Sequence, residues 1–111
     1  MRIAIVGSRS LSFDSFQDYV KQGDEIITGG ASGIDICAIK YAESENIPCT
    51  IIKPDYKKYG KCAPIIRNKE IVSIAERIVA VWDGKSKGTL SVIRYAEKIG
   101  KPLEVIFIDK I

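Results

Sequence analysis

Residues 26–35, Ile-Ile-Thr-Gly-Gly-Ala-Ser-Gly-Ile-Asp, join an apolar run to the expected start of an amphipathic helix. Gly29, Gly30 and Gly33 let backbone N–H groups come close together, because no Cβ atoms stand between them. The N-terminus of a helix that begins near Ser32 carries partial positive charge and points into the same space. The spacing differs from the dinucleotide fingerprint Gly-x-Gly-x-x-Gly. The junction therefore predicts an anion site that suits a phosphate group.

Asp35 has two interpretations at this junction. Ser32 and Asp35 match a capping box, Ser-x-x-Asp, in which the carboxylate only satisfies backbone donors at the helix start. Alternatively, Asp35 is a functional carboxyl beside the anion site. The residues alone leave both interpretations open.

A second polar loop follows the first expected strand. Ser8, Arg9 and Ser10 offer hydroxyl and guanidinium donors there, and Arg9 could hold a phosphate through two parallel hydrogen bonds. The alternative is a solvated arginine in a turn. Its position at the carboxyl end of a strand favours a functional role.

The loop at residues 83–89, Asp-Gly-Lys-Ser-Lys-Gly-Thr, contains Gly-Lys-Ser but is not a P-loop. A P-loop needs a glycine five residues before Gly84, where this chain has Val79 inside an expected strand. We expect a second anion cradle instead, with Gly88 allowing close backbone approach and Thr89 capping the next helix. Asp83 either hydrogen-bonds a ribose hydroxyl or ends the strand.

Residues 53–61 interleave Lys53, Lys57, Lys58 and Lys61 with Tyr56 and Tyr59. Such a segment could stack a base or follow a phosphate chain, although a charged flexible loop is the alternative. Just beyond Pro64, Arg67 and Asn68 fall in the first turn of an expected helix. Arg67 would be the second guanidinium at the same edge of the fold.

Short, nearly continuous apolar runs predict the strands that position these loops. They lie at residues 3–6, 25–28, 49–52, 78–82 and 103–108, and the pattern is typical of parallel strands covered on both faces. Helical spacing between them appears at Phe13–Val20, Ile34–Ala42, Ile66–Ala75 and Val92–Ile99. This alternation predicts an α/β fold, a Rossmann-like doubly wound three-layer sandwich with a five-stranded parallel sheet and helices on both faces. The strand-to-helix loops would then converge on one crevice at the carboxyl edge.

Composition limits the chemistry. The chain has 111 residues, 46% of them hydrophobic, and a formal charge of +3, which suits one domain over residues 1–111 and an anionic ligand. It has no histidine, so Ser-His and Cys-His nucleophile pairs are excluded and a zinc site is not expected. Three widely spaced cysteines predict reduced thiols. The first apolar stretch is too short for a signal peptide or a membrane span, so we expect a cytoplasmic protein.

Four segments together resemble a known superfamily. Ile-Val-Gly-Ser-Arg at 5–9, Thr-Gly-Gly-Ala-Ser-Gly-Ile-Asp at 28–35, Ala-Pro-Ile-Ile-Arg-Asn at 63–68 and Val-Trp-Asp-Gly-Lys-Ser-Lys-Gly-Thr at 81–89 resemble the SLOG superfamily. This superfamily includes the DNA-processing protein DprA, the LOG-type cytokinin-activating enzymes and small single-domain YpsA-like members, which the chain resembles most. The resemblance implies a Rossmann-like fold and a nucleotide or nucleotide-derived ligand.

Carried over to this sequence, the resemblance implies ligand contacts from Gly7, Ser8, Arg9, Gly29, Gly30, Gly33, Asp35, Arg67, Asn68, Gly84, Gly88 and Thr89; the residue-level interpretation adds Ser32 and Asp83. The chain departs from LOG-type phosphoribohydrolases at two places. Those enzymes carry Pro-Gly-Gly before their Gly-Thr pair, where this chain has Trp82-Asp83-Gly84. They also carry a glutamate three residues after the threonine, where this chain has Val92. The carboxylate for glycosidic cleavage is missing from that place.

Three functions compete on these grounds. The first is a module that binds a nucleotide or phosphorylated nucleoside. The second is an N-glycosidic hydrolase acting on nucleoside monophosphates, with Asp35 or Asp83 as acid or nucleophile and Arg67 holding the phosphate. The third, single-stranded DNA binding, depends on the segment from Tyr56 to Lys61. We also expect a homodimer, because four aromatic residues could supply an apolar interface: Tyr19, Tyr41, Trp82 and Tyr95.

Overall fold

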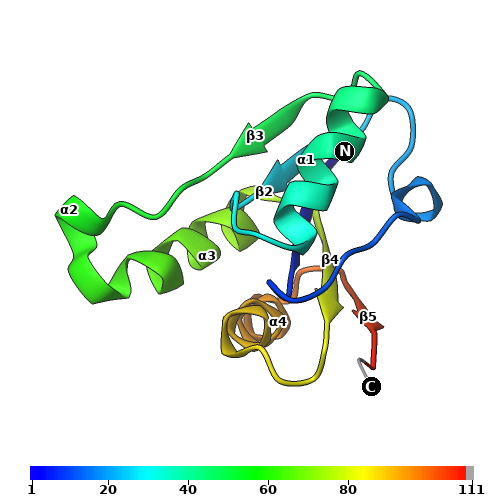
Figure 1. Cartoon of the computed structure of the whole chain (residues 1–111). Coiled ribbons are helices and arrows are strands. Elements are labelled where there is room, and N and C mark those ends of the chain that lie inside the picture. Colours follow the sequence, from blue (N-terminus) through cyan, green and yellow to red (C-terminus); the bar gives the residue numbers. More distant parts are fainter. Residues whose placement is uncertain (110–111) are drawn as a thin grey trace.

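The computed structural model describes residues 1–109 and contains one parallel sheet of five strands (Figure 1). The strands are β1 (Arg2–Gly7), β2 (Glu25–Thr28), β3 (Cys49–Ile51), β4 (Arg77–Trp82) and β5 (Leu103–Phe107). Their spatial order, β3-β2-β1-β4-β5, is that of a doubly wound sheet. The predicted α/β class with a five-stranded parallel sheet is confirmed.

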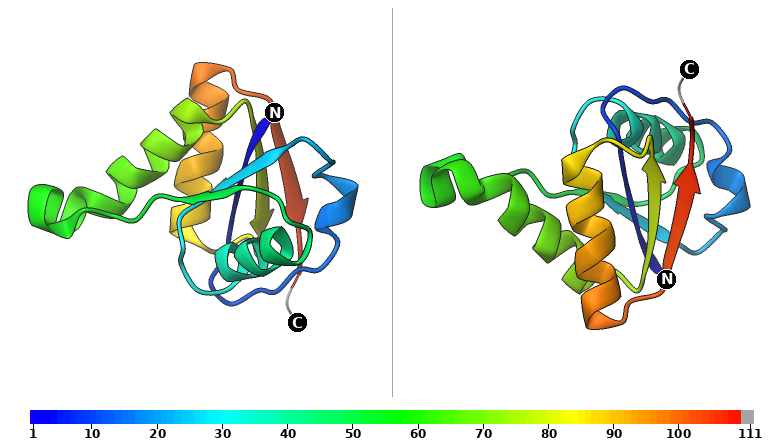
Figure 2. Two further views of the ribbon diagram at one scale, coloured as in Figure 1. Left: turned by 90° about the horizontal axis from the view of Figure 1, so that it is seen from above. Right: turned by 90° about the horizontal axis from the view of Figure 1, so that it is seen from below.

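Helices cover both faces of the sheet, as predicted. Helix α1 (Ile34–Ser44) lies on one face, and α3 (Ala63–Ile74) and α4 (Lys87–Ile99) lie on the other (Figure 2). Between β3 and α3 the chain forms the short α2 (Tyr56–Tyr59) and a 3-10 turn, η2 (Gly60–Cys62), at the end of an arm that projects from the body. The result is a three-layer sandwich.

Two hydrophobic cores follow from the alternation of side chains along β1. Ile3 and Ile5 point toward α1, whereas Ala4 and Val6 point toward α3 and α4. All four are buried, and a fully buried isoleucine or valine contributes about 1.5–3 kcal/mol relative to an exposed one. Apolar runs without alternation are what a strand buried on both faces requires.

The helix predicted over residues 13–20 does not form. The structure has only a 3-10 turn there, η1 (Phe16–Asp18), so the glycine at 23 caps no helix. Phe13 and Phe16 still pack into the core edge to face, with ring centroids 5.0 Å apart. Serine and aspartate residues intervene between the aromatic ones, and their side chains compete for backbone hydrogen bonds and disfavour a helix interior. The spacing of the aromatic residues therefore predicted correctly that Phe13 and Phe16 pack into the core, but the helix that it predicted is wrong.

The edge strands also differ from the expectation of complete coverage. Val105 and Phe107 of β5 are 41% and 60% exposed, and Ile51 of β3 is exposed as well. An edge strand has only one neighbour in the sheet, so the flanking helices do not extend over its outer side. The two predicted helix ends are confirmed: Pro64 lies in the first turn of α3, and Gly100 adopts a left-handed conformation after α4.

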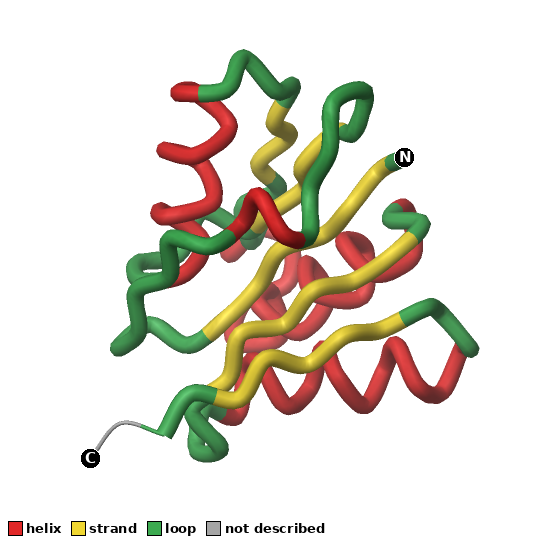
Figure 3. Tube along the Cα trace, turned by 90° about the vertical axis from the view of Figure 1, so that its right-hand side faces the viewer, coloured by secondary structure: helices red, strands yellow, loops and turns green. Residues whose placement is uncertain are grey.

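All five strands run in one direction, so their carboxyl ends share one edge (Figure 3). In a doubly wound sheet the loops after the two central strands turn to opposite faces and leave a crevice between them. Here those strands are β1 and β4, which pair with Val6 opposite Ala80. The topology therefore places the loops at residues 8–15 and 83–86 beside each other.

Candidate functional site

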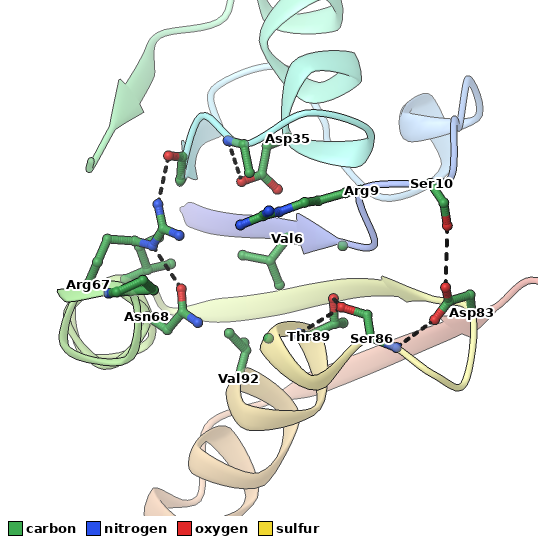
Figure 4. Close-up of a pocket in the computed structure, with 16 residues that line it drawn as sticks. Val6, Arg9, Ser10, Asp35, Arg67, Asn68, Asp83, Ser86, Thr89 and Val92 are labelled. Carbon is green, nitrogen blue, oxygen red and sulfur yellow. Dashed lines mark hydrogen bonds between the residues drawn. The ribbon is translucent and has the colours of Figure 1, made fainter. Parts of the chain in front are cut away.

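A cleft of about 350 Å³ opens at this switch point (Figure 4). Most of the residues singled out from the sequence line it. They come from the ends of β1 and β2, the first turn of α1, the first turns of α3, and the loop and first turn of α4: Gly7, Arg9, Gly29, Asp35, Arg67, Asn68, Asp83, Gly88 and Thr89.

Arg67 is fixed to the wall of this cleft. Its Nη1 donates to the carbonyl oxygen of Gly29 at 2.8 Å and to that of Ile52 at 3.3 Å, and its Nε donates to Asn68 Oδ1 at 2.8 Å. A Cβ atom on Gly29 would lie 2.6 Å from Arg67 Nη1. A side chain at position 29 would therefore displace the Arg67 guanidinium from its place on this backbone.

Asp35 lies in the first turn of α1 and is only 4% exposed. Its Oδ2 accepts a hydrogen bond from the backbone N–H of Ala31 at 3.2 Å. Burial raises the pKa of the Asp35 carboxyl, against the opposing effects of the Ala31 N–H and the charge of Arg67. The buried carboxyl thus faces the guanidinium across the floor of the cleft.

The capping-box interpretation of Ser32 and Asp35 is wrong. The residue that precedes the helix is Gly33, with φ of 78° and no side-chain cap, and the helix begins at Ile34 instead of near Ser32. Asp35 instead holds the loop before the helix through Ala31. The carboxyl is consequently free of the N-terminal capping role that its spacing indicated.

Two guanidiniums, of Arg9 and Arg67, share the cleft with two carboxyls, of Asp35 and Asp83. Arg9 extends across the cleft toward Arg67 (Figure 4). Burial lowers the pKa of Arg67, and the nearby positive charge of Arg9 lowers it further, while Asp35 opposes both. Guanidinium groups are charged in proteins. The cleft therefore holds two positive charges close together, with Asp35 near them and Asp83 in the loop before α4.

The start of α4 forms the opposite wall. Ser86 caps the helix by accepting from the Thr89 backbone N–H at 3.4 Å, and the two hydroxyl oxygens lie 3.2 Å apart. The expectation that Thr89 caps α4 is thus wrong, because the helix begins earlier, at Lys87. Thr89 sits in the first turn and is buried at the cleft surface. In the sequence, Ser86, three residues before Thr89, is the residue type and position that predict the cap correctly.

Asp83 shapes the loop that leads into α4. Its Oδ1 accepts from the backbone N–H groups of Lys85 and Ser86, each at 2.8 Å, and its Oδ2 accepts from Ser10 Oγ at 3.4 Å. These N–H groups lower the pKa of the exposed Asp83 carboxyl. Asp83 joins the loops after β1 and β4 and keeps its charge.

Three of the expected contacts, Ser8, Gly33 and Gly84, line neither this cleft nor its neighbouring compartment and have structural tasks. Ser8 is buried, and its Oγ accepts from the Asp83 backbone N–H at 3.2 Å. Gly33 packs against the carbonyl oxygens of Ser8 and Arg9, and Gly84 packs against the Phe107 ring. These residues hold the loops together.

The sequence interpretation missed the apolar floor of the cleft. Val6, Pro64, Ile71 and Val92 line it, and Ala31, Ser10 and Ser86 complete the rim. Helical spacing had assigned Ile71 and Val92 to the core, which is correct, since both belong to the core beneath α3 and α4. Only the tertiary structure shows that the same side chains also meet the cleft.

A second compartment of about 380 Å³ adjoins the first. It contains Gly30 and Ser32, which do not line the cleft itself, together with Lys53, Pro54 and Tyr56 from the start of the arm. Ile51 Cγ2 would lie 2.9 Å from a Cβ on Gly30, whose φ is 76°. Gly30 is therefore a backbone requirement of the turn.

Gly88 provides a test of whether an anion approaches the backbone at the start of α4. A Cβ at this position in the first turn of α4 would meet no atom within 4 Å, and its φ is not in the left-handed region. Gly88→Ala is therefore expected to stabilise the protein by about 0.5–1 kcal/mol through helix propensity. The same methyl group enters the cleft and should weaken binding of a phosphate that approaches the backbone. Urea unfolding and calorimetric titration of the variant measure both effects, and a variant that binds unchanged would contradict this assignment of the α4 wall.

No protein-family model, curated protein or solved structure matches the chain. Within residues 1–109, no helix combines the length and apolar character needed to cross a bilayer. In the same part of the chain, no group of three or more cysteine, aspartate or glutamate side chains could hold a metal ion. Cys37, Cys49 and Cys62 are free thiols.

Proposed function

We propose that the cleft binds a nucleotide or another phosphorylated nucleoside. The observation that carries this proposal is that Arg9 and Arg67 share one cleft with the N-terminus of α4. Of the two carboxyls in the cleft, Asp35 is buried and Asp83 accepts hydrogen bonds from N–H groups of its own loop. Two guanidiniums and a helix N-terminus all favour a phosphate. The apolar floor below them suits an uncharged ring, and the volume of the cleft lies within the usual range for small-molecule sites.

Thermal unfolding with a panel of nucleoside mono- and diphosphates tests the proposal. A ligand at a hundredfold excess over its dissociation constant stabilises the native state by about 2.7 kcal/mol. The unphosphorylated nucleosides serve as controls for the phosphate. If no phosphorylated nucleoside shifts the unfolding midpoint, the proposal is wrong.

A second candidate function is cleavage of an N-glycosidic bond, and the buried Asp35 carboxyl favours it. A carboxyl whose pKa is raised by burial can act as a general acid. Asp83 is a weaker candidate because its carboxylate is occupied by loop N–H groups. At the position of the glutamate in LOG-type enzymes, Val92 lines the cleft with an apolar side chain. This last observation ranks hydrolysis below binding.

Asp35→Asn separates the two functions. A hydrolase would lose release of free base from nucleoside monophosphates, whereas a binding module would keep or increase its affinity, because one negative charge leaves the cleft. The Asn68→Asp variant is not a suitable control, since its new carboxylate would pair with Arg67, whose Nε donates to Asn68 Oδ1. Asp18→Asn on the exposed surface of η1 is the matched control for the change in charge.

Asp35 also predicts a pH dependence of stability. Its pKa in the folded protein is raised above the unfolded value, so its stabilising contribution is fully present below about pH 3.9 and is lost as the pH rises through the folded pKa. Asparagine does not titrate. The free energy of unfolding of the wild type should therefore fall relative to that of Asp35→Asn as the pH rises above about 4. Urea unfolding at a series of pH values measures the difference.

The remaining expectations stay predictions. The four aromatic residues expected at a dimer interface, Tyr19, Tyr41, Trp82 and Tyr95, pack against the two cores. The homodimer stays a prediction, which light scattering tests. The cytoplasmic location also stays a prediction. For DNA binding, α2 carries exposed Tyr56 and Tyr59. Only Tyr56 of the two lines a compartment of the site.

A further inference from the structure

The cleft and the second compartment share a charged boundary. Both are lined by Arg9 and Arg67, and both include Gly29 and Ala31. The boundary between them is thus made of two guanidiniums and a glycine turn. The positive charge of the site is concentrated at this boundary.

The two sides of the boundary differ in chemistry. On the cleft side, the apolar floor, Asn68 and the buried Asp35 form a partly enclosed surface. On the other side, Tyr56 is 59% exposed and stands at the start of α2, next to Pro54 and Lys53. An exposed tyrosine ring beside a lysine is suited to stack on a planar group that carries no charge of its own.

Arg67 connects the second compartment to the first. Its Nη1 donates to the carbonyl oxygen of Ile52, which directly precedes Lys53, and the same nitrogen donates to Gly29. The segment that leads to Tyr56 is therefore tied to the guanidinium at the boundary. Proline at 54 restricts the backbone between this tie and the tyrosine.

We propose that the ligand is a phosphate or diphosphate ester with an uncharged group on each side, such as a dinucleotide. The phosphates lie across Arg9 and Arg67, one nucleoside fills the cleft, and the second ring system stacks on Tyr56. A monoester would leave the second compartment empty. Tyr56 is then the residue that selects extended ligands over mononucleotides. This inference rests on the proposed function of the cleft.

Calorimetric titration with matched ligands tests it. ADP carries the same diphosphate as di(adenosine-5′) diphosphate but only one nucleoside, and GDP and the corresponding diguanosine compound repeat the comparison with the other purine. The dinucleotide of the preferred base should bind about 5- to 150-fold more tightly than its diphosphate, which is the contribution of stacking one base. Tyr56→Ala should remove most of this advantage and leave the affinity for the diphosphate unchanged, whereas Tyr56→Phe should retain it.

Tyr59→Ala is the matched control. Tyr59 lies on the same short helix and is also exposed, but it lines neither compartment. Equal binding of dinucleotide and diphosphate would overturn the inference and leave the proposed function standing. So would a Tyr59→Ala variant that behaves like Tyr56→Ala, or a Tyr56→Ala variant that loses both ligands equally. If none of the four compounds binds, the inference is overturned, and the proposed function fails as well if no compound of the nucleoside phosphate panel shifts the unfolding midpoint.

Discussion

Replacing Arg67 with methionine should lower the affinity for a phosphorylated nucleoside about 10- to 100-fold, because a hydrogen bond to a charged group contributes about 1.5–3 kcal/mol. The phosphate loses one of its two guanidiniums. Asp35 also loses the charge that favours its ionised form, so the pKa of its carboxyl rises further. Calorimetric titration at neutral pH measures the effect.

Lysine at position 67 should rescue little of this loss. The arginine fork serves Gly29, Ile52 and Asn68 from two of its nitrogens, and a single ammonium group cannot reproduce that planar arrangement. Arg94→Met provides the matched control, since Arg94 is exposed on α4 and lines neither compartment. An Arg67→Met variant that folds and keeps wild-type affinity would remove the main support for the proposed site.

Gly33→Ala should be the most destabilising single methyl addition among the glycines of the site, with an expected loss of about 2–5 kcal/mol. Gly33 has φ of 78°, and a Cβ atom there would lie 2.5 Å from the carbonyl oxygens of Ser8 and Arg9. These are backbone atoms at the end of β1, so relief requires moving the loop or α1. Urea unfolding measures the free energy, and the melting midpoint should fall by roughly 10 °C or more.

Gly23→Ala separates the cost of the positive φ angle from the cost of the close contact of the Cβ atom. Gly23 has a similar φ of 91°, but a Cβ atom would meet nothing within 4 Å. It should therefore lose only about 1–2 kcal/mol from the backbone conformation. If both variants are destabilised equally, the close approach between Gly33 and the β1 loop is not what holds the cleft wall in place.

Much of the site could be predicted because a parallel sheet places the loops that follow its strands at one edge. Once five apolar runs alternate with helices, every strand-to-helix loop must emerge at one edge, so the sequence predicts Arg9, Gly30, Arg67 and Gly88 together. The structure brings Arg9, Arg67 and Gly88 to the cleft and places Gly30 in the second compartment. The order of strands then decides which loops face each other. A right-handed crossover rule limits that order strongly, and here the central pair is β1 and β4.

Local sequence patterns gave wrong predictions where two different backbone conformations are compatible with the same residue spacing. Phe13, Phe16 and Tyr19 reach the core from a 3-10 turn as well as from a helix, since burial depends on the side chains and not on the backbone between them. Ser32 and Asp35 satisfy a capping-box pattern, but the left-handed Gly33 starts the helix and turns the carboxyl toward Arg67. In both places a contact with a distant element decided the outcome.

The sequence by itself determined the α/β class, the parallel sheet and the edge at which the polar loops gather, because apolar periodicity and glycine positions are local properties of the chain. Only the tertiary structure decided that Arg67 binds the Gly29 carbonyl, that Asp35 is buried, and that Tyr56 lines a second compartment. The contact between Arg67 and Gly29 joins residues that are 38 positions apart in the chain. A local sequence pattern cannot predict such a contact, because it depends on how the elements pack at the sheet edge.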